Sequence, residues 1–466
     1  MTTMKKLITI ACLLVTTGIM AQQIERGTVL IKNGTVLTIT QGMKENTDVL
    51  IKDGKISQVG KNLTAPAGAR VIDATGHHVM PGIIDAHSHL ALDAVNEATT
   101  PVSAMVWEGD DLDPLDVGMY RAVAGGVTIS HAMHGSANAI GGQCQTIKHR
   151  YGTVDPKVLM MEGAPRTIKF ALGENPTRVH GNNGAGMVPN TRMGVEFVIR
   201  QAFSEGREYM DRWNKYNAAK NQKGFRGAPP KYDLRMETIA AILRGEIIIH
   251  CHSYRADEIY MLLKVCKDFG IKRLVFQHVN EGFKVAPELA AQGAMASVFA
   301  DWWAYKFEVY YSTAYNAAIL TRNGVVTSIN SDDAELTRHL YHEAAKTQKY
   351  GGLTDEEALS LITINPAKQL GIENRVGSLE VGKDGDVVIF KGHPLSVYAI
   401  PVYTLIDGVV KFDREKDADD MRLYVDPKQT IDITDAVFEE ESSHDHDECM
   451  KNAEFLLDVN FAGQKR

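Results

Sequence analysis

The stretch PGIIDAHSHL, residues 81–90, decides how the rest of the chain is interpreted. Its apolar residues indicate a short buried strand that ends in His87-Ser88-His89. Residues two apart in an extended strand point to the same side, so both imidazoles face one spot. Two imidazoles at one strand end are a suitable beginning for a metal site.

The chain has 466 residues, which is too long for one average domain. A barrel of about 250 residues together with a smaller domain accounts for this length. The formal net charge is -8, and no basic run or basic–aromatic stripe stands out. We therefore do not expect a nucleic acid as a partner.

Residues 1–21 have the pattern of a secretory signal peptide. Lys5 and Lys6 precede a short apolar run, and the small residue Ala21 marks the expected cleavage point. The run is too short to span a bilayer, and no later stretch suggests a stable membrane anchor. We expect an exported protein, periplasmic or secreted.

Alternating strands and turns fill residues 22–80, and a similar pattern returns in residues 371–435. Asn33-Gly34 is one of the hairpin turn signals in the first segment. We expect the two segments, from opposite ends of the chain, to assemble one small composite β-sandwich. Residues 436–466 form an acidic tail that contains two histidines, a pattern typical of a solvated segment.

Strand–helix alternation in residues 81–370 implies a parallel sheet. Eight strands can be counted from Gly82, and the third of them is expected at VLMMEGA, residues 158–164. This pattern predicts an α/β fold with a (β/α)8 TIM-type barrel, whose active site lies at the carboxyl ends of the strands. A doubly wound sheet is the alternative. Residues 194–244 are typical of a helical, charged insertion.

Residue types that ligate metals recur at the ends of these strands. They are His87, His89, Lys169, His250, His252, His278, Asp332 and Asp333. Burying such polar groups without partners costs several kcal/mol each, roughly. A divalent cation would supply the shared charge that such a group needs.

The chain resembles the amidohydrolase superfamily of metal-dependent hydrolases, in the branch with imidazolonepropionase-like and prolidase-like enzymes. The similarity rests on PGIIDAHSHL, AGGVTIS, GSANAIGGQ, IKFALGENP, HCHSYRADEI, FQHVNEG, NSDD, ITINPAKQLGI and RVGSLEVGKDGDVVIF, between about residues 28 and 412. It implies a (β/α)8 barrel with a flanking β-sandwich. It also implies hydrolysis of a C–N bond, amide or cyclic amide, in a dipeptide, an N-acyl amino acid or an imidazolone.

The resemblance also implies roles for individual residues. The metal ligands would be His87 and His89 for the more buried ion, Lys169 carboxylated on its ε-nitrogen as the bridge, and His250 and His278 for the second ion. Asp332 would bind the first ion and act as the catalytic base, which takes a proton from water and delivers it to the leaving amine. The expected cofactor is a divalent metal, Zn²⁺ by default, with one or two ions per chain.

Each of three assignments has a competitor: Glu174 for Lys169, His252 for His250, and Asp333 for Asp332. A bridging Glu174 would need no modification, whereas Lys169 must be carboxylated because an ammonium group has no lone pair. The superfamily pattern favours Lys169, His250 and Asp332. The outer histidine, His252, is then the one placed to contact substrate.

Loop residues supply further substrate-binding candidates. They are Asn138 and Gln143 in GSANAIGGQ, His180, His252 and Tyr254, followed by Arg178, Arg192 and Trp302-Trp303. Structural packing is an equally ordinary role for most of these residue types.

Two other functions compete with amide hydrolysis. A deaminase of the same superfamily tends to place a Glu three residues after the fifth-strand histidine, where this chain has Ser253. A non-catalytic metal-binding barrel would lack the base, whereas Asp332 is present. The sequence therefore favours an exported hydrolase that acts on a small-molecule substrate, and it is compatible with a homo-oligomer.

Overall fold

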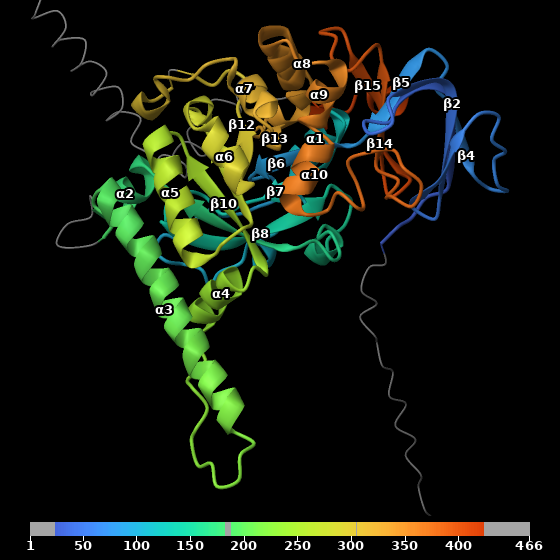
Figure 1. Ribbon diagram of the computed structural model, residues 1–466. Helices are drawn as coiled ribbons and strands as arrows, with labels where there is room; N and C mark the ends of the chain where they lie inside the picture. Colours follow the sequence, from blue (N-terminus) through green and yellow to red (C-terminus); the bar gives the residue numbers. More distant parts are fainter. Residues whose placement is uncertain (1–23, 182–187, 304, 424–466) are drawn as a thin grey trace, which may run out of the picture.

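The computed structural model describes residues 24–181, 188–303 and 305–423, which form a barrel and a neighbouring sheet (Figure 1). The expected signal peptide, residues 1–21, and the acidic tail, residues 436–466, lie outside the described residues. Every helix in the described part of the chain is too short or too polar to cross a lipid bilayer.

Eight strands form the barrel, and each lies beside its neighbour in sequence. They are β6 (Ile83–Ser88), β7 (Val127–Ala132), β8 (Ile140–Lys148), β9 (Arg166–Ala171), β10 (Ile247–Ser253), β11 (Leu274–His278), β12 (Met295–Val298) and β13 (Thr327–Ile329). The barrel nearly closes where the segment after β13 meets β6, and there the amide of Asp332 donates to the carbonyl of His87 at 3.1 Å. The predicted α/β barrel is thus confirmed.

The third barrel strand differs from the expectation. Residues 158–164 form no strand, and the third strand is β8, which runs antiparallel to both β7 and β9. The sequence predicts a loop at GSANAIGGQ, whereas β8 begins within this segment at Ile140. Its glycines are needed for close packing instead, because a Cβ on Gly141 or Gly142 would lie 2.7 Å from the ring of His134.

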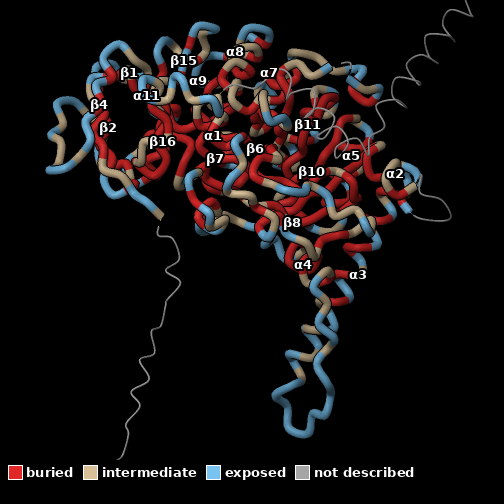
Figure 2. The backbone as a smooth tube through the Cα atoms, turned by 180° about the vertical axis from the view of Figure 1, so that it is seen from behind, coloured by how far each residue is buried: buried red, intermediate tan, exposed pale blue. Residues whose placement is uncertain are grey.

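Helices cover the outside of the barrel (Figure 1). They are α1 (Val117–Ala124), α2 (Glu174–Gly181), α5 (Ala256–Phe269), α6 (Ala286–Gln292), α7 (Asn316–Arg322), α8 (Leu340–Gly351), α9 (Asp355–Ser360) and α10 (Ile364–Leu370). The predicted helical insertion is an arm of α3 (Arg192–Ala219) and α4 (Leu234–Leu243) that projects from the barrel. Figure 2 shows buried barrel strands and an exposed far end of this arm.

Strands from both chain ends build the second sheet. They are β1 (Val29–Leu37), β2 (Met43–Lys52), β3 (Lys55–Gly60), β4 (Arg70–Asp73), β5 (His77–Pro81), β14 (Val387–Lys391), β15 (Ile400–Ile406) and β16 (Val409–Asp413). The strand order is β16-β15-β14-β5-β1-β2-β3, with β4 beside β1. The two halves meet where β14 pairs antiparallel with β5. This mixed sheet confirms the predicted union of the two ends.

A buried ion cluster joins this sheet to the barrel. Lys148, at the end of β8, is fully buried, and its Nζ lies 2.8 Å from Asp384, 2.9 Å from Asp386 and 2.6 Å from Asp407. Arg150 also pairs with Asp407, at 2.7 Å. Charges can be buried in this way only when each has partners, so the cluster fixes the sheet against the barrel.

Candidate metal centre

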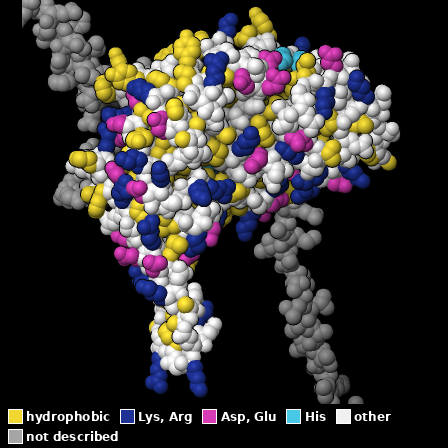
Figure 3. Space-filling model, viewed as in Figure 1, with side chains coloured by type: hydrophobic (Ala, Val, Ile, Leu, Met, Phe, Trp, Pro, Cys, Tyr) yellow, Lys and Arg dark blue, Asp and Glu magenta, His cyan; other side chains and the backbone are white. Residues whose placement is uncertain are grey.

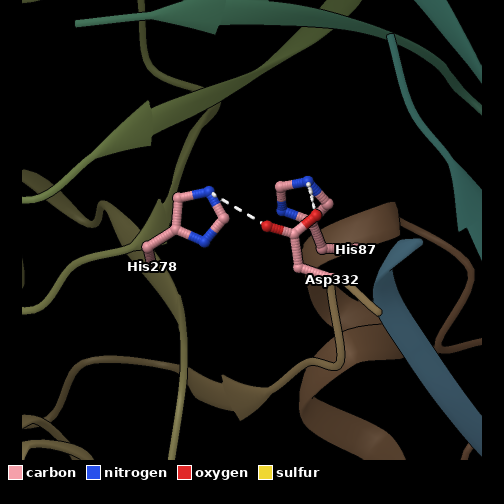
Figure 4. A group of neighbouring side chains, drawn as sticks. All are labelled: His87, His278 and Asp332. Atoms are coloured by element: carbon pink, nitrogen blue, oxygen red, sulfur yellow. Dashed lines mark ion pairs between the residues drawn. The ribbon is translucent and has the colours of Figure 1, made fainter. Parts of the chain in front are cut away.

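Three side chains from separate strands converge at the carboxyl end of the barrel (Figure 4). We call His87, His278 and Asp332 the ligand group, because their nitrogen and oxygen atoms lie within 4.8 Å of one another. Oδ1 of Asp332 is 3.3 Å from Nε2 of His87, and its Oδ2 is 3.8 Å from Nε2 of His278. Two imidazoles and a carboxylate are ligands that divalent ions use in proteins.

His89 and Lys169 lie beside the ligand group. Nε2 of His89 is 3.2 Å from Oδ1 of Asp332, and its Nδ1 donates to the carbonyl of Met133 at 2.8 Å. With Nδ1 engaged by this carbonyl, Nε2 is the ring nitrogen that faces the carboxylate. Nζ of Lys169 lies 3.0 Å from Nε2 of His87, and burial lowers the pKa of Lys169.

The donor set fits a divalent cation. Neither ring nitrogen of His278 has a hydrogen-bond partner among the described residues, although the ring is buried. Burial lowers the pKa of His278 to about 3 and holds the pKa of His87 well below its ordinary value. Both rings are therefore neutral and offer lone pairs. A buried imidazole without a partner is costly unless something binds to it.

The backbone at this site is strained. His278, Val279 and Asp332 have φ angles of 67°, 52° and 46°, in the left-handed region. For a β-branched residue such as Val279 this is a genuine outlier. Residues held in this way concentrate at functional sites, where the surrounding structure over-determines them. The strain thus supports a functional role for the ends of β11 and β13.

Gln277, which the sequence analysis missed, holds two histidines at once. Its Oε1 accepts a hydrogen bond from Nδ1 of His87 at 3.1 Å, and its Nε2 donates to Nδ1 of His250 at 2.9 Å. Regular strand alternation would direct Gln277 away from the face that carries His278. The positive φ of His278 breaks this alternation, so the sequence pattern held no signal for Gln277.

The structure separates His250 from His252. The ring of His250 packs against His131 of β7, with ring centroids 4.4 Å apart. His252 packs instead against His278, with centroids 4.6 Å apart. The outer histidine of the pair therefore lies beside the ligand group.

The two competing carboxylates lie outside the ligand group. Asp333 accepts hydrogen bonds from two backbone amides of the following turn, at 2.8 and 2.6 Å. Glu174, at the start of α2, pairs with Arg178 at 3.5 Å and with Lys306 at 3.4 Å. Cations are thus the partners of Glu174, whereas Lys169 contacts a histidine.

A second buried carboxylate, Asp85, supports the strand that carries the histidines. It accepts hydrogen bonds from the backbone amide of Ser331 at 3.2 Å, from the hydroxyl of Ser331, and from Oγ1 of Thr337 at 3.0 Å. Asp85 therefore fixes the segment before Asp332 against β6. It lies in the decisive PGIIDAHSHL stretch, but its role depends on residues far along the chain.

Tyr254, a predicted substrate-binding residue, lies beside His278 of the ligand group. Its ring stacks on His278 with centroids 5.2 Å apart, and its hydroxyl accepts from the hydroxyl of Tyr305 at 2.8 Å. Nζ of Lys306 lies 4.1 Å from the centre of the same ring. Tyr254 and His252 therefore form one wall beside the ligand group.

The remaining candidates have structural partners. Asn138 donates to the carbonyls of Glu97 at 2.8 Å and Thr100 at 2.6 Å. Gln143 accepts from Arg166 at 2.7 Å, at the start of β9 and thus away from the carboxyl end of that strand. The other three are placed as follows: His180 is buried on α2, Arg192 pairs with Glu258 at 3.1 Å, and Trp302 stacks on Phe299.

Comparisons with known proteins identify relatives of this chain. Residues 307–414 match the model of the amidohydrolase family. The crystal structure of an amidohydrolase from Thermotoga maritima MSB8 is 36% identical, covers 83% of this chain and 100% of that chain, and has a TM-score of 0.75. A 5-methylthioadenosine/S-adenosylhomocysteine deaminase from Symbiobacterium thermophilum is 22% identical, over 82% of this chain and 90% of its own.

Amidohydrolase tasK from Hapsidospora irregularis is 32% identical over 78% of this chain, and this chain spans only 40% of tasK. The Thermotoga structure, in contrast, is covered over its full length. Its similarity agrees with the barrel described above. The chain therefore belongs to the amidohydrolase superfamily of metal-dependent hydrolases.

Proposed function

We propose that this protein hydrolyses a C–N bond, an amide or a cyclic amide, in a small molecule such as a dipeptide, an N-acyl amino acid or an imidazolone. The observation that carries the proposal is the ligand group, whose atoms lie within 4.8 Å of one another at the carboxyl end of the barrel. A divalent cation bound there, with Zn²⁺ the expected ion, polarises a carbonyl and acidifies water.

We propose that side chains in and beside the ligand group hold two ions. His87, His89 and Asp332 would hold the first ion, His252 and His278 would hold the second, and carboxylated Lys169 would be the bridging ligand. His252 takes the place of His250 because Gln277 donates to Nδ1 of His250, so that His250 carries its proton on Nε2. The bridging role of Lys169 is supported by its 3.0 Å contact with His87.

Asp332 is the proposed general base. Its Oδ1 lies 3.3 Å from His87 and 3.2 Å from His89, whereas its Oδ2 faces His278. The carboxylate thus reaches both sides of the centre. It accepts a proton from the attacking water and returns this proton to the leaving amine. Tyr254, whose ring stacks on His278, orients the substrate.

Hydrolytic deamination is the second candidate, and the similarity to a deaminase over 82% of this chain favours it. Deaminases need an acid to protonate a ring nitrogen, and that Glu is expected three residues after the fifth-strand histidine. Ser253 stands at this position if it is counted from His250, and Arg255 if it is counted from His252. The hydroxyl of Ser253 donates to the carbonyl of Gln277 at 3.2 Å. It is therefore engaged with the backbone, and amide hydrolysis remains the preferred function.

Metal content and activity together test this proposal. We expect about two ions per chain in protein purified without chelators, and fewer in His252→Ala and in Lys169→Ala, whereas His250→Ala retains more metal than His252→Ala. Asp332→Asn should reduce kcat for dipeptides or N-acyl amino acids by about 10²- to 10⁴-fold. A wild-type protein that binds no divalent metal would refute the proposal.

We also propose that residues 1–21 direct export. The support is the sequence pattern alone, with its basic start, short apolar run and Ala21. We expect the mature protein to begin at Gln22 and to fractionate with the periplasm or the medium. Amino-terminal sequencing of the fractions tests this, and an uncleaved cytoplasmic protein would contradict it.

A further inference from the structure

Exposed aromatic side chains gather on the loop between β12 and α7. We call them the aromatic ridge; they are Trp303, Tyr305, Phe307, Tyr310, Tyr311 and Tyr315, and each is between 41% and 72% exposed. Figure 3 shows apolar side chains gathered over this loop. Contiguous apolar surface of this kind marks a binding surface on a folded protein.

In this loop a charged side chain is buried and the aromatic side chain next to it is exposed. Glu308 is only 5% exposed, whereas the neighbouring Phe307 is 72% exposed. The buried charges are paired, because Arg192 contacts Glu308 and Nζ of Lys306 lies 3.4 Å from Glu174. The ion pairs hold the inner side of the loop against the barrel, and the rings are left facing outward. Such an arrangement costs stability unless the rings have a partner.

Stacked rings connect the aromatic ridge to the metal centre. Phe299 stacks on His278 with centroids 4.8 Å apart, and Trp302 stacks on Phe299 at 4.4 Å. Tyr305, a member of the ridge, makes an edge contact with Trp302 at 5.7 Å and donates to the hydroxyl of Tyr254. The ridge therefore continues a series of packed rings that starts at His278, a residue of the ligand group.

We propose that the aromatic ridge binds a large apolar or aromatic group that flanks the scissile amide, so that amides carrying such a group are the preferred substrates. This inference rests on the proposed function and specifies its substrate class. The continuity of rings from His278 to Tyr305 favours a substrate over a second copy of the chain, because a second copy would cover the rim of the site. Contact with one ridge ring should change affinity by about 2- to 10-fold.

Three probes test the ridge. N-acetylglycine has no ring, N-(4-phenylbutanoyl)glycine carries a phenyl ring on the acyl side of the amide, and N-acetylphenylalanine carries one on the amine side. Their binding is measured by calorimetry in Asp332→Asn, where turnover is blocked, and their hydrolysis is measured in the otherwise wild-type enzyme. Phe307→Ala and Tyr310→Ala remove exposed rings without opening the core. Tyr398→Ala, which removes an 86% exposed ring in the turn between β14 and β15, is the matched control.

We expect at least one phenyl probe to bind about 10-fold or more tightly than N-acetylglycine. Each ridge variant should weaken that binding by about 2- to 10-fold and leave N-acetylglycine unchanged, and Tyr398→Ala should affect neither. The inference is overturned if all three probes bind with equal affinity, or if neither ridge variant changes the affinity for the phenyl probes. This holds even if the enzyme hydrolyses every probe.

The proposed function fails separately from the ridge. Ring-dependent binding without hydrolysis of any amide would support the ridge and refute amide hydrolysis. If the ridge variants instead convert a dimer to monomers in sedimentation experiments, with unchanged probe selectivity, the ridge is an interface between copies and the inference is overturned.

Discussion

Replacing Gln277 with leucine removes a hydrogen bond from His87, a proposed metal ligand, and a hydrogen bond to His250. The 3.1 Å bond from His87 and the 2.9 Å bond to His250 are lost, and a buried side chain of similar size remains. Each bond contributes about 1 kcal/mol. Because only the His87 bond orients a proposed ligand, the metal dissociation constant should rise about 5-fold.

Competition with a chromophoric zinc chelator measures this dissociation constant directly. Gln369→Leu is the matched control, because Gln369 is also fully buried and its amide bonds to Ser328, at 2.7 Å, and to the carbonyl of Ala296, at 2.9 Å. We expect both variants to lower the free energy of unfolding by similar amounts. Only Gln277→Leu should weaken metal binding.

An unchanged zinc affinity in Gln277→Leu would refute this reasoning. So would an equal loss of affinity in Gln369→Leu, because the effect would then follow from general destabilisation of the barrel and not from the orientation of His87.

Three further predictions concern stability. Lys148→Met should lower the free energy of unfolding, measured in urea, by about 3–5 kcal/mol, because Asp386 loses its ammonium partner. Burial raises the pKa of Asp386 to about 6, so adding Asp386→Asn should recover part of the loss. No recovery in the double variant would contradict the proposed role of the ion cluster. Burial raises the pKa of Glu258 to about 7, so the wild-type protein should lose stability as the pH rises from about 4.5 to 7, where the unfolded chain ionises first. Glu258→Gln should remove about 1–3 kcal/mol of this loss between pH 5 and pH 8, whereas the exposed control Glu208→Gln should not. Identical stability profiles in wild type and Glu258→Gln would contradict this prediction. Chelation should lower the Tm by several degrees, roughly, and Zn²⁺ should restore it, whereas a chelator-insensitive Tm would count against a bound metal.

Local patterns were enough to predict the barrel, the composite second sheet and the ligand group. His87, His278 and Asp332 could be predicted from sequence because each follows an apolar strand, and the carboxyl ends of barrel strands meet at one face. The helical insertion was also readable, since its charged, helical pattern is local. The sequence signals for these features each come from residues that are neighbours in the chain.

Contacts between distant segments decided the rest. The third strand of the barrel is β8, in which Gly141 and Gly142 leave room for the ring of His134. This contact between segments leaves no trace in the hydropathy pattern. His250 packs against His131 and His252 packs against His278, and both of these partners lie on other strands. The sequence by itself determined which residues reach the end of the barrel. Only the tertiary structure decided which of them face one another, because that depends on packing across strands.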